Sequence, residues 1–552
     1  MKLDTSTDPQ VGYRPAGSLD LASALQPYDG HWGPRQAAHL ARRAGFGPTP
    51  AEIDRSVAAG MAGSVATLLH PTNEEVAFPA YPDTTALLDV HKRTVTAQMW
   101  WLDRMLRTKR PLLEKMTLFW HGHFATSTNK VEARYMCEQI DLFRSMALGN
   151  FRSLLIATAQ NPAMLIWLDN RQNVAAHPNE NFAREVMELF TLGLGAYTED
   201  DVHAAARAFT GWGLDKAARF AFHPAQHDPA SKTFLGRTGT FDGTDIIDII
   251  VQQPVHTRFL AHKLLEFFVY SDPEPELIDA VADVYARSGT NVAQVVGALL
   301  RSNVFYSSRA YRALPKSPIE FTVGLLRYMD VAQTPADIPY WLQRMGQAPL
   351  APPSVKGWDG GPTWINTATL LSRFNLVNKV VKSSPPRLSA PPVLAATSMT
   401  GVPAMAGAPA PAVVAPGTTT AGAVTAVPGV PAAAQSAKLA AMPGAAGAAP
   451  MAAVPPKTTP PPAPPPPLAT FPAYTPDVVV AAAGGLDAGR VLATLLAGAV
   501  QNDVTSDVRR TLIAYLQSEN ATLPTPFGAE NYQEKIRGVL ALVLNLPSNQ
   551  LN

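Results

Sequence analysis

The chain has 552 residues, which is enough for two or more domains of ordinary size. Its 44 acidic and 45 basic residues nearly cancel, so the net charge gives no support to a nucleic-acid partner or to binding on an anionic membrane surface. Cys137 is the single cysteine, which excludes an intrachain disulfide framework and a cysteine-based zinc cluster.

The N-terminus and the apolar stretches bear on location. The first twenty residues carry neither the basic nor the apolar segment of a secretory signal, so we expect a cytoplasmic protein. The sequence has no uninterrupted apolar run of about 18 residues, and we expect no membrane-spanning helix. It also lacks the Walker A, G-x-G-x-x-G, G-x-S-x-G and H-E-x-x-H motifs, so the familiar nucleotide-binding, serine hydrolase and zincin assignments lose support.

Residues 1–33 are typical of an irregular leader, and residues 34–383 predict one large helical domain. Helical periodicity, first-turn prolines and capping residues mark its helices. The expected helices are two within Pro34–Leu69, then Ala97–Thr108, Pro111–His121, Val131–Leu148, Phe151–Gln160, Asn179–Gly193, Val202–Thr210, Asp245–Val251, His256–Tyr270, Pro275–Arg287, Val292–Arg301, Pro318–Met329 and Ala336–Met345. Arg219–Gly236 is the one expected β element, as a small hairpin or an ordered loop.

Over residues 384–475 the composition changes to Pro, Ala, Gly, Val and Thr, which predicts a disordered or polyproline II linker. Residues 476–552 regain helical periodicity at Asp487–Val500, Ser506–Ser518 and Tyr532–Leu546. The expected fold is therefore mainly α. It comprises a large multi-helix body with at most a small β-hairpin, plus a C-terminal helical unit after a Pro/Ala-rich linker. This unit is either a separate domain or a layer packed on the body.

The stretch HPNENFAREVMELFTLG, His177–Gly193, predicts a helix with two chemically different faces. Asn179 is placed as its N-cap and Gly193 as its stop. The apolar face holds Phe182, Val186, Leu189 and Phe190, and the polar face holds Asn181, Arg184, Glu185 and Glu188. Either the polar face is only solvated, or it lines a cleft. In a cleft, Glu185 and Glu188 would serve as acid and base or as ligands, with Arg184 organising their charge and Asn181 binding substrate.

The segment FWHGHFATS, Phe119–Ser127, brings two histidines close in sequence. On a helix, His121 and His123 would diverge by about 200°, but in an extended segment they would share one face. Gly122 favours a helix end there, which frees His123 to face a cleft. His-x-His is a recurrent metal-ligand spacing, and with Glu185 and Glu188 the pair could hold zinc, iron or manganese. The alternative is two hydrogen-bonded histidines packed among aromatic rings.

Two loops supply further candidates. The loop His223–Gly236 concentrates His227, Asp228 and Lys232 around prolines, for which we expect a substrate-binding or lid role. The loop Pro352–Trp364, PPSVKGWDGGPTW, offers Trp358 and Trp364 as flat walls for a sugar, a ring or an apolar chain. In each case the alternative is structural, a capped hairpin turn for the first loop and a packed loop with core tryptophans for the second.

Four stretches together resemble the bacterial domain-of-unknown-function 1800 family. They are HLARRAGFGPTPAEI (His39–Ile53), EKMTLFWHGHFATS (Glu114–Ser127), HPNENFAREVMELFTLGLGAYTEDDV (His177–Val202) with its trailing AFTGW, and PPSVKGWDGGPTWINTATLLSRFN (Pro352–Asn375). The resemblance spans roughly residues 35–382 plus the final helix. It implies a large, mainly helical protein without an established reaction, often encoded beside a protein that resembles the alkaline phosphatase and sulfatase group. Gly122 stands where family members often carry Asn, and the Pro/Ala-rich insertion is a second departure.

The leading hypothesis is an acid/base or metal-assisted hydrolase, with Glu185 and Glu188 as acid/base groups or ligands and His121 and His123 as ligands or proton carriers. Its cofactor is unknown, with a divalent metal as the candidate. The alternative is a non-catalytic helical scaffold or partner-binding protein. A third hypothesis, a haem or redox protein with a histidine axial ligand, finds no C-x-x-C-H motif to support it.

Overall fold

The computed structural model describes residues 21, 23–71, 78–81, 87, 89–382, 476–518 and 527–552. Of the leader expected at residues 1–33, residues 23–33 form turns and bends, and Pro27 makes an antiparallel bridge to Ser302. The linker predicted at residues 384–475 lies outside the described residues. The helical segments on either side of it belong to one compact unit.

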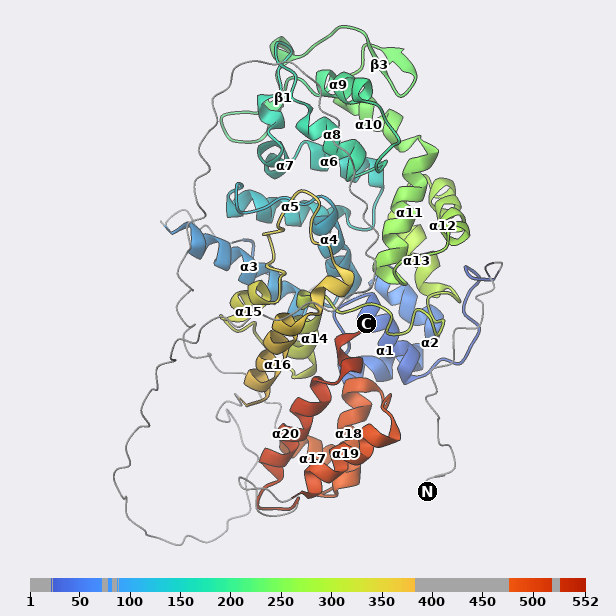
Figure 1. Ribbon diagram of the computed structural model, residues 1–552, viewed down its shortest axis with the longest axis vertical. Helices are drawn as coiled ribbons and strands as arrows, with labels where there is room; N and C mark the ends of the chain where they lie inside the picture. Colours follow the sequence, from blue (N-terminus) through green and yellow to red (C-terminus); the bar gives the residue numbers. More distant parts are fainter. Residues whose placement is uncertain are drawn as a thin grey trace, which may run out of the picture. The chain divides into compact units, whose positions relative to one another are not determined.

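The mainly α fold is confirmed, since the described residues form twenty α-helices and four short strands (Figure 1). The helices of the body are α1 (Pro34–Arg43), α2 (Pro50–Leu69), α3 (Val90–Arg107), α4 (Pro111–His123), α5 (Ala133–Met146), α6 (Phe151–Ala159), α7 (Pro162–Trp167), α8 (Glu180–Glu188), α9 (Glu199–Ala208), α10 (Gly243–Val251), α11 (Pro254–Phe268), α12 (Pro275–Arg287), α13 (Val292–Arg301), α14 (Pro318–Tyr328), α15 (Ile338–Arg344) and α16 (Thr367–Lys382). The C-terminal helices are α17 (Pro476–Ala483), α18 (Ala488–Val500), α19 (Ser506–Gln517) and α20 (Tyr532–Leu544).

Local sequence signals account for where many helices begin. The predicted capping box before α9 is present, because the Thr198 hydroxyl accepts from the Asp201 N–H and the Asp201 carboxylate accepts from the Thr198 N–H. Ser317 and Glu320 form the same box at the start of α14. The helix α3 begins seven residues before its predicted start, because the Asp89 carboxylate caps the His91 N–H at 2.8 Å.

The β content differs from the single predicted hairpin. The structure has two separate two-stranded antiparallel sheets, the first pairing β1 (Trp212–Leu214) with β2 (Phe220–Phe222). The second pairs β3 (Lys232–Phe234) with β4 (Arg237–Gly239) across a turn in which Leu235 and Gly236 both have positive φ. The predicted β element ended at Gly236, whereas in the structure Gly236 lies in the turn between two strands and the second strand continues to Gly239.

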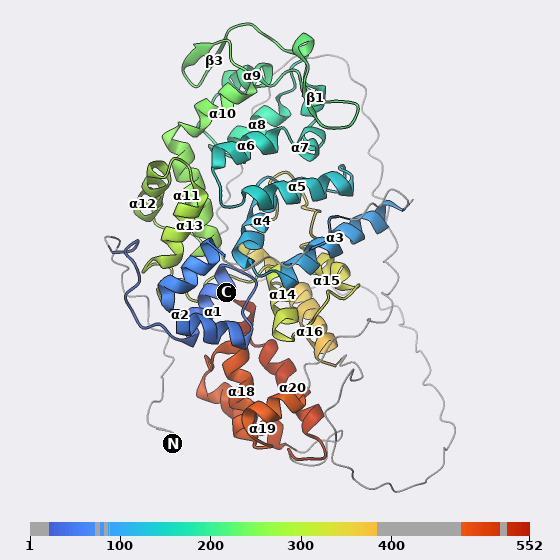
Figure 2. The same ribbon diagram turned by 180° about the vertical axis from the view of Figure 1, so that it is seen from behind.

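Helices of the body pack around one hydrophobic core that includes Trp101, Trp120, Phe124, Phe151 and Phe190, each almost fully buried. The helices α11, α12 and α13 contact one another and lie side by side in both views (Figure 1 and Figure 2). The helix α8 packs on α9, and α4 packs on α5. This arrangement brings the end of α4, the end of α8 and one face of α11 within reach of a common space.

The C-terminal helices pack on the body as well as on one another. The helix α20 contacts α17, α18 and α19, and it also contacts α16 of the body. Beyond α20 the chain pairs with the body again, since Leu551 bridges Pro315 and the Lys316 N–H donates to the Gln550 carbonyl at 2.8 Å. These contacts place the C-terminal helices in the same compact unit as the body.

Among the described residues, no single helix is long and apolar enough to span a membrane. The helices α17 and α18 together have a sufficient length and an apolar composition, but they are bent by 107° relative to each other.

Candidate functional site

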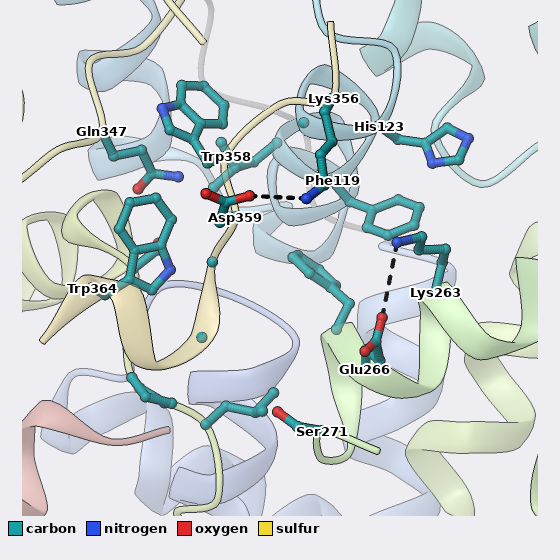
Figure 3. Close-up of a pocket in the computed structure, with 18 of the residues that line it drawn as sticks. Phe119, His123, Lys263, Glu266, Ser271, Gln347, Lys356, Trp358, Asp359 and Trp364 are labelled. Atoms are coloured by element: carbon teal, nitrogen blue, oxygen red, sulfur yellow. Dashed lines mark hydrogen bonds and ion pairs between the residues drawn. The ribbon is translucent and has the colours of Figure 1, made fainter. Parts of the chain in front are cut away.

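A cavity of about 500 Å³ opens between the end of α4, the end of α8, α11 and the loop between α15 and α16 (Figure 3). It is lined by residues from three of the stretches that the sequence singled out: His123, Glu188, Trp358 and Trp364. In the close-up, Trp358, Trp364 and Gln347 lie on one side, while Lys263 and Glu266 of α11 lie on the other. Folding therefore joins motifs that are more than 200 positions apart in the chain.

His123 occupies the last position of α4, at one side of this cavity. Its Nε2 lies 3.0 Å from the Phe190 carbonyl oxygen, which can only accept, so Nε2 carries the hydrogen and Nδ1 is the ring's free lone pair. The ring stacks on Phe119, with the ring centroids 5.8 Å apart. Removal from water and the charge of Lys263 lower the pKa of His123 to about 3, so its imidazole is neutral at pH 7.

His121 does not join His123, because α4 continues through Gly122 and the two rings leave the helix in different directions. Its side chain is fully buried between Trp101 and Trp358, and Nε2 accepts the Leu350 N–H at 3.2 Å. Burial lowers the pKa of His121 to about 3. The predicted helix end at Gly122 is wrong, and the shared His-x-His face that depended on it is not formed.

The donor set does not fit the metal centre that the sequence suggested. Within the part of the chain that the structure describes, no group of three or more His, Cys, Asp or Glu side chains is arranged to hold a metal ion. His121 already accepts a backbone hydrogen bond, and Nε2 of His123 is turned to a carbonyl. A zinc, iron or manganese centre built on these histidines and the α8 carboxylates would require different positions for them.

Glu188 is the carboxylate of α8 that reaches the cavity. It stands at the last position of the helix, and its Oε2 accepts a hydrogen bond from the Tyr197 hydroxyl at 2.8 Å. Burial and this interaction with Glu188 raise the pKa of Tyr197 to about 12, so the phenol keeps its proton and orients the carboxylate at neutral pH.

The other predicted residues of α8 do not line the cavity. Burial and the charge of Glu188 raise the pKa of Glu185, which is half-buried beside it. Arg184 donates from both terminal nitrogens to Glu199 on α9, at 2.8 and 2.7 Å, which raises the pKa of Arg184. Asn181 is exposed and donates to the Leu168 carbonyl at 3.2 Å. The predicted N-cap Asn179 is confirmed, since it accepts the Asn181 N–H. The predicted stop at Gly193 is wrong, because the helix already ends at Glu188 and Gly193, despite its positive φ, lies five residues beyond that end.

The tryptophan loop is held against α4 by a close backbone approach. Gly357 has φ of +86°, and a Cβ at this position would lie 2.3 Å from the Gly122 carbonyl oxygen, so only glycine fits. Trp358 follows at once and packs edge-on against His121, with the ring centroids 5.5 Å apart. Trp364 is buried at the end of a short 3₁₀ turn (Gly361–Trp364), where its carbonyl accepts the Thr369 hydroxyl at 3.0 Å. Both aromatic walls predicted from this loop face the cavity.

The residues predicted in the loop His223–Gly236 lie outside the cavity, and their side chains bind the end of α9 and the loop's own backbone. Asp228 pairs with Arg207 of α9 at 2.6 Å, and His227 lies 3.0 Å from the Thr210 carbonyl. Lys232 is buried in β3, and its ammonium donates to the Asp228 and Ala230 carbonyls at 2.6 and 3.0 Å. These contacts fix the loop against the end of α9, as expected of the structural alternative for this segment.

Several cavity residues were not predicted. Lys263 and Glu266 of α11 form an i,i+3 pair at 4.0 Å, and Lys356 pairs with Asp359 at 3.1 Å (Figure 3). In the sequence such pairs indicate a solvated helix or loop surface, so they give no signal for a site. Gln347 is buried, and its side-chain oxygen accepts the Ile319 N–H at 3.0 Å, which fixes its amide at the cavity wall.

One side of the cavity rests on a buried ion pair. Glu320 lines it and pairs with Lys115, whose side chain is 1% exposed. Burial, then the charge of Arg43, lower the pKa of Lys115. Removing either partner would leave the other charge buried and unpaired, which is costly. The pair therefore holds the Glu320 side chain in place at the cavity wall.

The arrangement combines flat apolar walls with paired positive and negative groups. Aromatic faces bind ring or sugar surfaces, while ammonium groups and carboxylates bind polar substituents and can exchange protons. Cys137 is buried in α5, and burial raises the pKa of its thiol, so it offers no thiolate for covalent chemistry.

Comparison with known proteins gives one match. The model of the family described as "Protein of unknown function (DUF1800)" matches residues 39–551, which is nearly the whole chain. No curated protein and no solved structure matches this chain.

Proposed function

The chain belongs to the DUF1800 family, and on that premise we propose that its cavity binds a small organic molecule and hydrolyses it by metal-independent acid/base chemistry. The observation that carries this proposal is the convergence of His123, Glu188, Trp358 and Trp364 on one cavity of about 500 Å³. That volume lies within the range of about 300–1,000 Å³ that is typical of ligand sites.

The ligand class follows from the walls. Trp358, Trp364 and Phe259 offer apolar faces, which suit a ring or a sugar. Lys263 and Lys356 offer ammonium groups, while Glu266 and Asp359 accept hydrogen bonds. A molecule with one flat face and several polar substituents, at least one of them anionic, complements this lining.

Glu188 is the residue that we assign to proton transfer. The Tyr197 hydroxyl orients its carboxylate through a hydrogen bond of 2.8 Å, and Glu188 lines the cavity. In the proposed step Glu188 takes a proton from water as the water oxygen bonds to the substrate, and the proton then passes to the leaving group as its bond breaks. His123 is a poor general base, because its pKa of about 3 is far below neutral pH, and we assign it to positioning.

A panel of ester, phosphoester, glycoside and amide substrates with ring-bearing groups tests the proposal. We expect turnover of one class, its loss by at least about 100-fold in Glu188→Gln, and near wild-type turnover in Glu185→Gln. Glu185 is the matched control, because it lies on the same helix outside the cavity. Equal loss in both variants, or turnover that survives in Glu188→Gln, would refute the assignment of Glu188.

Binding is tested separately from turnover by thermal shift with a library of ring-bearing polar compounds. A Trp358→Phe variant keeps a ring against His121 but reduces the cavity wall. Compounds that stabilise the wild type and not this variant support the site. Stabilisation with no turnover of any substrate class would leave a binding protein and refute the hydrolase. Metal analysis of the wild type and of His123→Gln should give the same metal content in both.

One observation favours the alternative, a partner-binding protein. Leu370, Leu371 and Phe374 of α16 are 41%, 59% and 46% exposed, and their spacing places them on neighbouring positions of one helix. The candidate partner is the protein that members of this family are often encoded beside. Co-purification of the two proteins that is lost in Leu371→Glu would support this function, and co-purification unaffected by that substitution would refute this surface.

A further inference from the structure

Four cationic side chains gather where the body meets the C-terminal helices: Arg42 of α1, Arg312 and Lys316 before α14, and Arg373 of α16. Arg42 and Arg373 are 6% and 1% exposed, and the Arg312 side chain is 9% exposed. After burial, the charges of Arg42, Arg312 and Arg373 are the largest influences that lower the pKa of Lys316. We call these four residues the cation cluster.

The cation cluster is short of negative charge. Among the ion pairs of the described residues, its members share a single carboxylate, Asp503, which lies 3.4 Å from Arg312. The other partners are neutral oxygens. Arg42 donates to the Gln501 amide at 2.7 Å, and Arg373 donates to the Gln550 amide at 3.2 Å and to the Lys316 carbonyl at 2.7 Å. Arg312 donates to the Val500 carbonyl at 3.1 Å, and the Lys316 ammonium donates to the Asn549 carbonyl at 2.8 Å and to its side-chain oxygen at 3.3 Å. Arginine keeps its proton in proteins, so even a neutral Lys316 leaves three guanidinium charges against one carboxylate.

Hydrogen-bonding capacity is left over in the same place. The Nε and Nη2 atoms of Arg42 and the Nε atom of Arg373 are buried without a hydrogen-bond partner among the described residues. Buried charged donors are costly unless they are paired, and a cluster of them is costlier because they repel one another.

A small cavity opens beside Arg42. It has a volume of about 40 Å³ and is lined by Arg42 and Lys316, by Phe46 and Gly324 of the body, and by Gln501 and Asn549 of the C-terminal segment. This volume exceeds the 10–15 Å³ or so that one water requires, but it is too small for an organic ligand. Its lining combines cations with amide groups and lacks a carboxylate.

We propose that this cavity binds a monovalent inorganic anion of chloride size, which Arg42 and Lys316 hold and which joins the C-terminal helices to the body. The anion supplies the negative charge that Asp503 alone does not, and it accepts hydrogen bonds from guanidinium and amide N–H groups. The site is separate from the larger cavity with Glu188, since the two cavities share no lining residue.

The first test uses the full chain and bromide, which fits the same site and scatters X-rays anomalously. Crystals soaked in bromide should show an anomalous peak within hydrogen-bond distance of Arg42 and Lys316. Bromide peaks at other positions only, or water alone in this cavity, would overturn the proposal.

The second test is thermal stability at constant ionic strength and constant cation, with chloride replaced stepwise by gluconate, which is too large for the cavity. We expect the melting temperature to rise by about 2–4 °C from gluconate to 0.3 M chloride, because an anion that binds only the folded state stabilises it. The Arg42→Gln and Lys316→Met variants should lose this difference. The matched control is Arg490→Gln, an exposed arginine on α18 that pairs with Asp487.

Each outcome of the melting experiments supports or refutes the anion site. An equal melting temperature in gluconate and chloride refutes the site in the wild type, and a chloride effect that persists in Arg42→Gln assigns it to another place. Should both cluster variants fail to fold, the bromide experiment on the wild type still supports or refutes the site alone.

Discussion

Gly357 carries the sharpest structural prediction, because it is the point where the tryptophan loop touches α4. In a Gly357→Ala variant the new methyl group would lie 2.3 Å from the Gly122 carbonyl oxygen, and the residue would keep φ of +86°. The left-handed backbone costs an alanine about 1–2 kcal/mol, and forcing a methyl group into a packed contact costs about 1–3 kcal/mol. We therefore expect the free energy of unfolding to fall by about 2–5 kcal/mol.

Gly360 offers a matched control in the same loop. It also has a positive φ, of +71°, but the nearest atoms to a Cβ there are 3.9 and 4.0 Å away. Its ψ of −167° places it in a region that essentially only glycine adopts, so Gly360→Ala should cost only the backbone part, about 1–3 kcal/mol. Urea unfolding of both variants, followed by tryptophan fluorescence, measures the two losses. Equal losses would show that the contact with Gly122 does not position the loop.

Three further predictions concern titration and ion pairs. Burial lowers the pKa values of His121 and His256 to about 3 and about 4, so the folded state binds protons less readily than the unfolded state. The free energy of unfolding should therefore fall as pH drops below about 6.5, by about 1.4 kcal/mol per pH unit for each histidine. In His121→Gln the plot of the urea midpoint against pH should have a smaller slope. The pKa of Glu185 is raised, so its contribution to the free energy of unfolding is present at low pH and is lost as pH rises through that pKa. Glu185→Gln should therefore stabilise the protein at pH 7 by less than about 1 kcal/mol and have no effect at pH 3, which calorimetry measures. Arg184→Met removes the bidentate pair with Glu199 at the surface and should cost less than about 1 kcal/mol in urea unfolding, while a cost above 3 kcal/mol would contradict the exposed character of this pair.

Much of the helical architecture could be predicted because local chemistry decides it. Asn179 and Thr198 act as cap and capping-box residue in the structure as they do in the sequence pattern. The signals lie within four residues of the helix end that they specify, so no tertiary contact is needed to recognise them.

The choice between Glu185 and Glu188 could not be made from periodicity. Both stand on the polar face of α8, and only the positions of the other segments that line the cavity decide which one reaches it. The same holds for His121 and His123, since the sequence could not tell whether α4 stops before or after Gly122. A difference of one residue in a helix end rotates a side chain by about 100°.

Lys263 and Glu266 were invisible to sequence reasoning for a different reason. Their i,i+3 spacing has an ordinary explanation as a solvated pair, and nothing in α11 itself shows that the helix borders a cavity. Aromatic residues in a glycine-rich loop are less ordinary, which is why Trp358 and Trp364 could be selected.

The helices that flank residues 383–475 have a common neighbour, since α16 and α17 both contact α20. A cut in the chain between Lys382 and Pro476 would therefore leave two fragments that share a packed interface. The main cavity needs both, because Asn552 lines it and donates its N–H to the Leu314 carbonyl at 2.8 Å. Expressed as two polypeptides, the protein would serve as a complementation pair. Ligand binding in the main cavity would then report that the two fragments have associated.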